Sequence, residues 1–229
     1  MDWSVVAEYY PRLIDGAWVT LQLVVLSGFI GIILAIPMAL ARISNKRCIN
    51  QFPRLYIFFF RGTPLLIQIF LIYYGLSQFE WVKNSALWPF LREPYWCAVI
   101  TLGLHTTAYI AEILRGALQA IPAGEVEACR VMGMRKFTMY RCILLPRAFG
   151  IMLPAYSNEI ILMLKGSALA STITLLDLTG MARTIIARTY TPEEIYIAAG
   201  AIYLLISWMF MAFFKLLDRY FNKHRLVTV

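Results

Sequence analysis

The chain has 229 residues, of which 60% are hydrophobic and 15% are charged, and its formal net charge is +8. An ordinary globular domain is about 45–50% apolar and about 25% charged, so this composition excludes a disordered chain, a disulfide scaffold and a free cytosolic enzyme. It indicates an all-α integral membrane protein that crosses the bilayer several times.

Residues 1–16 precede the first long apolar run and carry more acidic than basic side chains, with Asp2, Glu8 and Asp15 against Arg12. A cleavable signal peptide has a positively charged region ahead of its apolar run. This segment has none, so we expect it to be an N-terminal segment outside the membrane.

Five segments satisfy the requirement for a bilayer crossing, which is about 20 mostly apolar residues. The second segment carries Arg61 near its start, and the fourth contains Pro154 and Glu159. The sequence therefore predicts about five transmembrane helices. Their expected positions are residues 17–41, 55–78, 95–114, 148–164 and 195–214.

The first span has a face of small residues, because Ser27, Gly31 and Ala35 follow one another at four-residue spacing. Such a face lets another helix approach closely in lipid. Close packing within the subunit is favoured over an oligomer contact.

Basic residues gather in three regions that lie on the same side of the membrane if the chain has five spans. Residues 42–61, 115–147 and 215–225 hold 15 of the 21 Lys and Arg residues. Cytoplasmic loops are enriched in these two residue types. We therefore expect the N-terminus outside and the C-terminus in the cytoplasm, with residues 218–229 as a basic tail.

The basic residues and the cysteines indicate no other class of protein. No basic stripe lies on a polar segment with interleaved aromatic residues, so binding to nucleic acid is not expected. The four cysteines form no CxxC pair and no metal-ligating cluster with a histidine, so we expect free thiols and no metal. They are Cys48, Cys97, Cys129 and Cys142.

The long connection at residues 116–145 has the pattern of a helical hairpin. Residues 125–132 and 135–144 are good helix formers, Gly133 is placed to end the first helix, and Pro146 is expected to stop the second. Its apolar side chains suit a groove on a partner protein; the alternative is a hairpin that folds back on the membrane surface. These side chains are Val131, Met132, Met134, Phe137 and Met139.

The sequence around this hairpin resembles the EAA loop of bacterial ABC-importer permeases. The matching positions are Glu127-Ala128-Cys129, Gly133 and Ile143-Leu144-Leu145-Pro146, with Cys129 where the family has alanine. Other stretches resemble the polar amino-acid subfamily, and within it the M-type permease of histidine, lysine, arginine and ornithine importers. They are Arg61-Gly62-Thr63-Pro64 with Gln68, Ala108-Tyr109 with Glu112 and Arg115-Gly116, Pro122 with Gly124, and residues 153–159.

This resemblance implies a type I importer transmembrane domain over residues 17–217, with the EAA loop at residues 116–146 as a cytoplasmic coupling helix. It implies a multi-pass subunit of the bacterial inner membrane that works with a second homologous permease and a periplasmic solute-binding protein. Residues 1–16 are then periplasmic. The external residues 166–194 are expected to form an outer gate or to touch the delivering protein.

The resemblance also implies that a separate ATP-binding subunit, in two copies, drives alternating access. The chain lacks a GxxxxGK[ST] loop, so it is expected to bind no ATP and no other cofactor itself, and not to be an enzyme. The implied function is import of amino acids, basic ones above all. The residues expected to dock the ATPase are Glu127, Ala128, Cys129, Met132, Gly133 and Met134.

Glu159 is the ionisable residue deep within a span, where such a group costs about 2.5–3.5 kcal/mol even on lenient insertion scales. From the residues alone, a role in the solute path and a structural role, as an ion pair or a protonated glutamate, are equally favoured. The resemblance favours the path, although cargo-binding members of the subfamily often carry an acid two helical turns later, where this chain has Gly166. The other expected path residues are Ser157, Asn158, Thr63 and Gln68.

The remaining polar residues of the spans have plainer interpretations. Arg61 is expected to extend to the cytoplasmic interface, and the Thr63–Pro64 pair to break a helix start. Glu112 and Arg115 stand three residues apart and are expected to form a local ion pair. His105 is expected to be a hydrogen-bonded core histidine.

Two other classes of function are weighed against the importer. An intramembrane enzyme requires a nucleophile with a base, or metal-ligand spacing, at matching depth, and the sequence shows neither. A self-sufficient proton-coupled carrier that uses Glu159 is the alternative that remains.

Overall fold

The computed structural model describes residues 3–222, which form helices joined by short connections, with no strand among them. This confirms the all-α fold class. In chain order the elements are α1 (Ser4–Ile43), α2 (Arg47–Gly62), α3 (Leu65–Phe70), η1 (Leu71–Gly75), η2 (Leu76–Gln78), α4 (Glu80–Lys83), α5 (Trp88–Leu91), α6 (Pro94–Gln119), α7 (Ala123–Val131), α8 (Lys136–Met139), η3 (Tyr140–Leu144), α9 (Leu145–Ser167), η4 (Ala168–Ile173), α10 (Leu178–Thr189) and α11 (Pro192–Phe221).

Three of these helices, α1, α6 and α11, are each long and apolar enough to cross a membrane. Two pairs of helices, each joined by a bend, are also long and apolar enough to cross a membrane. Residues 47–78 bend by 107° between α2 and α3, and residues 136–189 bend by 49° before α10. Counting each bent pair as one span gives up to five spans in residues 3–222, in agreement with the predicted number.

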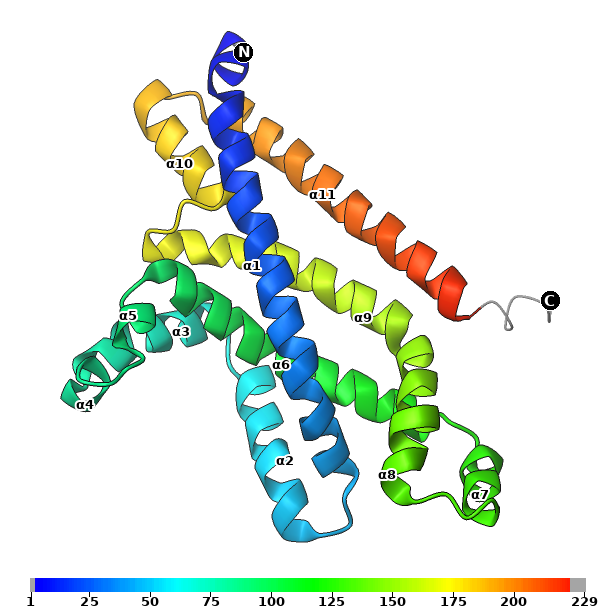
Figure 1. Cartoon of the computed structure of the whole chain (residues 1–229). Coiled ribbons are helices and arrows are strands. Elements are labelled where there is room, and N and C mark those ends of the chain that lie inside the picture. The colour runs from blue at the N-terminus through cyan, green and yellow to red at the C-terminus, as the bar shows by residue number, and fades with distance from the viewer. Residues whose placement is uncertain (1–2, 223–229) are drawn as a thin grey trace.

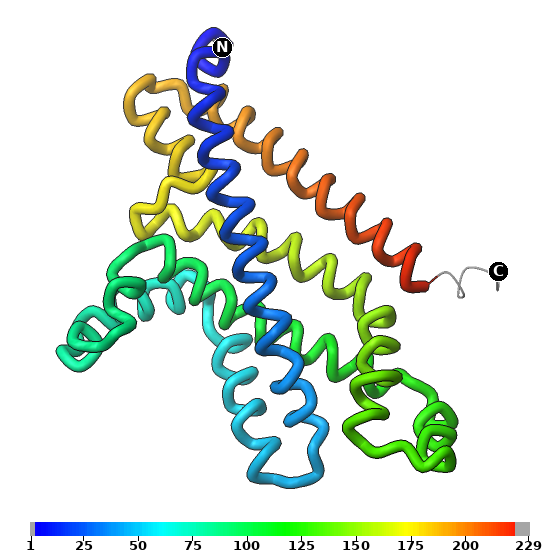
Figure 2. Tube along the Cα trace, viewed as in Figure 1, coloured from blue at the N-terminus to red at the C-terminus, as the bar shows by residue number. Residues whose placement is uncertain are grey.

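Helix α1 runs through the whole molecule and carries the first predicted span (Figures 1 and 2). It begins at Ser4, so the helix of the first span already includes residues 4–16. Its first turns lie near α10, and its last turns lie beside α2 at the end of the molecule that also holds α7. The end of α1 and the start of α2 therefore lie at the same end of the molecule as the α7–α8 hairpin.

The predicted second span, residues 55–78, is not one straight helix, and it breaks at the Thr63–Pro64 pair, which was expected to break a helix start. Helix α2 already begins at Arg47 and ends at Gly62, and the chain turns sharply before α3. Thr63 has an extended backbone, with φ −114° and ψ 144°, because the residue before a proline avoids the helical region. Pro64 also lacks the N–H that would continue the helical hydrogen bonds.

The hairpin between the third and fourth spans has the expected first helix but a different second half. Helix α7 covers most of residues 125–132, and Gly133 follows it with φ +72°, a left-handed conformation that glycine adopts without strain. The prediction that Pro146 stops the second helix is wrong, since α8 and the π-helical turn η3 lead directly into α9. Pro146 is the second residue of α9 and directly follows the π-helical turn η3, so the helical path continues through it.

The small-residue face of α1 packs against α6 within the subunit. The hydroxyl of Ser27 donates to the carbonyl of Val99 at 3.1 Å. A Cβ added to Gly31 would lie 3.1 Å from Thr106 and 3.2 Å from Ile110. Ser27 and Ala35 have no exposed surface, which confirms close packing inside the chain as the role of this face.

The predicted third, fourth and fifth spans lie within α6, α9 and α11. Of the predicted basic tail, residues 223–229 lie outside the described residues. Met1 and Asp2 of the predicted N-terminal segment lie outside them as well.

Gly31→Leu should lower the stability of the subunit by about 1–3 kcal/mol, because the added side chain has no room between α1 and α6. Thermal unfolding of the purified protein in detergent measures this effect. Gly200→Leu is the matched control, since nothing lies within 4 Å of a Cβ at that position of α11. Equal melting temperatures for the two variants would contradict the close approach.

Candidate functional site

The carboxylate of Glu159 lies on α9 and lines a small cavity with a volume of about 120 Å³. Glu159 is only 6% exposed. Within residues 3–222, no hydrogen bond and no ion pair shorter than 4.0 Å reaches it. A buried charge without a partner is costly, so this carboxylate marks the cavity as a candidate site. The other residues that line it are Leu65, Leu102, His105, Tyr109, Leu162 and Met163.

The amide of Gln68 holds the break between α2 and α3 in shape. Its Nε2 donates to the carbonyl oxygens of Phe60 at 2.9 Å and Thr63 at 3.1 Å, and lies 2.8 Å from the Thr63 hydroxyl. These carbonyls belong to the end of α2, where the helix leaves them without helical partners. Thr63 and Gln68 were both predicted as path residues; neither lines the cavity, but the structure brings them together at the break that carries Leu65 of its wall.

His105 of α6 forms a hydrogen bond with Gln68. Its Nδ1 lies 2.9 Å from Oε1 of Gln68. Because an amide oxygen only accepts, Nδ1 donates in this hydrogen bond. The prediction of a hydrogen-bonded histidine is confirmed, and the same side chain also lines the cavity with Glu159.

The guanidinium of Arg61 stacks on an aromatic ring of the cavity. It lies 5.0 Å above the ring centroid of Tyr109, a geometry that attracts a cation to the ring face. Its positive charge also acts on Glu159. The plain interpretation, in which Arg61 extends to the interface, did not anticipate this position. No signal in the sequence placed Tyr109 next to Arg61.

Two predicted path residues do not meet Glu159 in this cavity. Ser157 donates its hydroxyl to the carbonyl of Pro154 at 2.8 Å and lines a separate pocket between α9 and α11. Asn158 is exposed. A helix turns by about 100° per residue, so Ser157 and Glu159 face nearly opposite ways despite their closeness in sequence.

The α7–α8 hairpin presents part of its predicted docking surface to the outside. Val131, Met132 and Phe137 are 88%, 79% and 74% exposed, and Glu127, Ala128 and Gly133 are exposed as well. Met134 is half-buried, whereas Cys129 and Met139 are 4% and 5% exposed and pack inward. Met139 is therefore no part of an outer apolar surface. Cys129 anchors α7, and its small apolar side chain suits that place.

Ionic contacts join this hairpin and the helix ends near it. Glu125 of α7 and Arg147 of α9 lie 3.4 Å apart. Glu112 of α6 accepts two hydrogen bonds from Arg115, at 2.7 and 2.9 Å, which confirms the predicted pair. Glu112 also lies 3.3 Å from the guanidinium of Arg42 at the end of α1.

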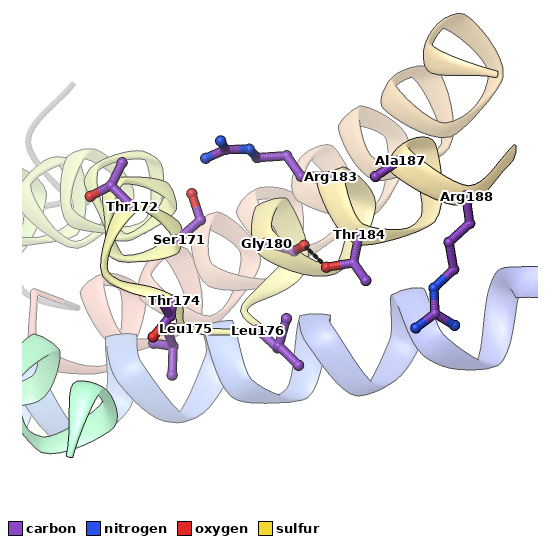
Figure 3. A pocket seen from close by; sticks show the side chains of 10 residues that line it. All are labelled: Ser171, Thr172, Thr174, Leu175, Leu176, Gly180, Arg183, Thr184, Ala187 and Arg188. Carbon is purple, nitrogen blue, oxygen red and sulfur yellow. Dashed lines mark hydrogen bonds between the residues drawn. The ribbon is translucent and has the colours of Figure 1, made fainter. Parts of the chain in front are cut away.

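A larger pocket of about 710 Å³ lies between η4 and α10, in the predicted external segment. Arg183 extends from α10 toward the side of Ser171 and Thr172, and Arg188 lies at the opposite end of the pocket (Figure 3). The side chain of Asp177 caps α10 by accepting from the backbone N–H groups of residues 179 and 180. This pocket is separate from the cavity at Glu159.

Comparisons with known proteins agree on one family. A family profile described as "Binding-protein-dependent transport system inner membrane component" matches residues 29–223. The octopine transport system permease protein of Rhizobium meliloti is 49% identical over 92% of this chain and 86% of its own length. The histidine/lysine/arginine/ornithine transport system permease protein of Escherichia coli (strain K12) is 44% identical over 96% of each chain. A solved "amino acid ABC transporter with histidines" has a TM-score of 0.84 at 36% identity and covers 96% of this chain and 99% of its own.

Gln68→Leu should destabilise the protein by about 1–3 kcal/mol, because it leaves buried polar groups of Phe60, Thr63 and His105 without their partner. Thermal unfolding in detergent tests this. Gln78→Leu removes a single exposed hydrogen bond of 3.3 Å and should change little. If both variants melt with the wild type, Gln68 does not hold the break.

Proposed function

Because the chain belongs to the family of binding-protein-dependent transport system inner membrane components, we propose that it conducts solutes with a cationic side chain and that Glu159 receives the cation. The family predicted from the EAA-loop resemblance is confirmed. The chain is a non-catalytic, multi-pass permease subunit of the inner membrane in an ABC importer of amino acids. It works with a separate ATPase subunit, a second permease and a solute-binding protein.

The single observation that carries the proposal is the unpaired carboxylate of Glu159 in a cavity of a membrane-spanning helix. A structural ion pair or hydrogen-bonded glutamate needs a partner, and residues 3–222 supply none within 4.0 Å. An ammonium or guanidinium group from a solute would provide the missing partner through charge-assisted hydrogen bonds. The Tyr109 ring beside it offers a second group that attracts cations.

The relatives support a basic cargo. One is a permease for octopine and another a permease for histidine, lysine, arginine and ornithine. Lysine, arginine and ornithine carry a cationic side chain, and octopine is chemically a derivative of arginine. A carboxylate in the path suits this shared feature.

The α7–α8 hairpin is the proposed contact with the ATPase subunit. In this proposal the ATPase subunit binds ATP, and this chain does not. Val131, Met132 and Phe137 give it an exposed apolar surface, and buried Cys129 fixes α7 to the membrane helices. We place this end of the molecule in the cytoplasm on the basis of its basic residues. Family membership favours this ATP-driven mechanism over an autonomous proton-coupled carrier.

Glu159→Gln should reduce arginine uptake at least tenfold, because a hydrogen bond to a charged group contributes about 1.5–3 kcal/mol and about 1.4 kcal/mol corresponds to a factor of ten. Uptake of radiolabelled L-arginine into proteoliposomes that hold the complete importer measures this. The exposed Glu193→Gln is the control and should transport normally. Normal uptake by Glu159→Gln, with the ATPase still bound, would refute the proposed role.

Met132→Glu should weaken binding of the ATPase subunit, because it places a charge in the apolar contact surface of the hairpin. Co-purification of the ATPase with the tagged permease measures binding. Leu87→Glu makes the same kind of change at another exposed position, 62% exposed between α4 and α5, and should leave co-purification unchanged. Wild-type recovery of the ATPase with Met132→Glu would place the contact elsewhere.

A further inference from the structure

We propose that Arg61 is a resident cation of the Glu159 cavity, which a cationic solute must displace and which thereby favours cationic over neutral cargo. This inference rests on the proposed function, in which Glu159 receives the cation of the solute. It adds a residue from another helix, α2, that competes for the same two groups.

The Arg61 charge lies beside the aromatic ring of the cavity. Its guanidinium lies 5.0 Å above the ring of Tyr109, and Tyr109 lines the cavity with Glu159. The charge also acts on the Glu159 carboxylate, without an ion pair shorter than 4.0 Å in residues 3–222. The carboxylate and the aromatic face are the groups that would bind a cationic solute, so one side chain of this chain already stacks on one of them and acts through its charge on the other.

Arg61 can leave its position at the Tyr109 ring without disrupting the fold. It lies in the last turn of α2, next to the break at Thr63 and Pro64, and it is exposed. Within the described part of the chain, no carboxylate holds it in an ion pair. Its long side chain can therefore turn away while the hydrogen bonds of Gln68 keep the break in shape.

The cavity is small for a ligand site. Its volume of about 120 Å³ is well below the roughly 300–1,000 Å³ of typical ligand pockets. Leu65 lines it and packs closely on α9, since a Cβ added to Gly166 would lie 2.9 Å from the Leu65 side chain. Leu65 and Arg61 lie on either side of the break at Thr63 and Pro64. A movement of this break would therefore widen the cavity and withdraw Arg61 at the same time.

The consequence is a preference for cationic solutes. When a solute cation replaces the Arg61 cation, a positive charge still acts on Glu159 and now pairs with it directly. A neutral solute that displaces Arg61 leaves a buried carboxylate without a counter-charge, which is unfavourable. Arg61 therefore lowers the affinity for every solute and penalises neutral solutes most.

The test is binding of radiolabelled L-arginine to the assembled importer in nanodiscs, without the solute-binding protein. Arg61→Gln should bind L-arginine about tenfold more tightly, since a cation–π contact with its charge interaction corresponds to about that factor. Arg61→Lys keeps a competing charge and should stay close to wild type. Arg54→Gln, an exposed arginine on the same helix, is the matched control and should not change binding.

The direction of the effect separates competition from a structural role. Loss of a merely structural arginine would weaken binding, so unchanged or weaker binding by Arg61→Gln overturns the inference. Glu159→Gln in the same assay tests the underlying function. If it abolishes binding while Arg61→Gln has no effect, the competition alone is wrong; if Glu159→Gln binds normally, the proposed function itself fails.

Discussion

The structure depends on one constraint, a carboxylate buried in a membrane-spanning helix without a partner in residues 3–222. Such a group costs at least about 2.5–3.5 kcal/mol, and buried polar groups with structural roles are normally hydrogen-bonded. Around Glu159 the neighbouring polar groups do satisfy one another, because Gln68 bonds to Thr63 and His105. The chain thus leaves one charge available for a group from outside.

Helix α6 connects this cavity with the hairpin that we propose as the contact for the ATPase. His105 and Tyr109 line the cavity, and Glu112, less than one turn further along, binds Arg115 and the end of α1. Beyond Gln119 the chain enters α7. A displacement of the hairpin can therefore reach the cavity along a single rigid helix, which is a physical basis for coupling between the two sites.

Charge-free apolar runs were sufficient to predict the long helices, because lipid exposure imposes that composition directly. The apolar run continues through Thr63 and Pro64, and there the proline, through its backbone sterics, predicted the break instead. The cavity was harder to predict, since Arg61, Tyr109 and Glu159 come from three helices and meet only through packing. Closeness in sequence led to a wrong grouping of Ser157 with Glu159, because the two side chains face nearly opposite ways on α9. The motif resemblance identified the family but not this arrangement.

The most direct test of the central claim is a structure of the complete importer, determined by cryo-electron microscopy in nanodiscs with saturating L-arginine. The account predicts density for the solute beside this subunit, with its guanidinium within hydrogen-bonding distance of Glu159. A solute bound in the membrane domain away from Glu159, or a Glu159 carboxylate paired with a residue of another subunit, would contradict it.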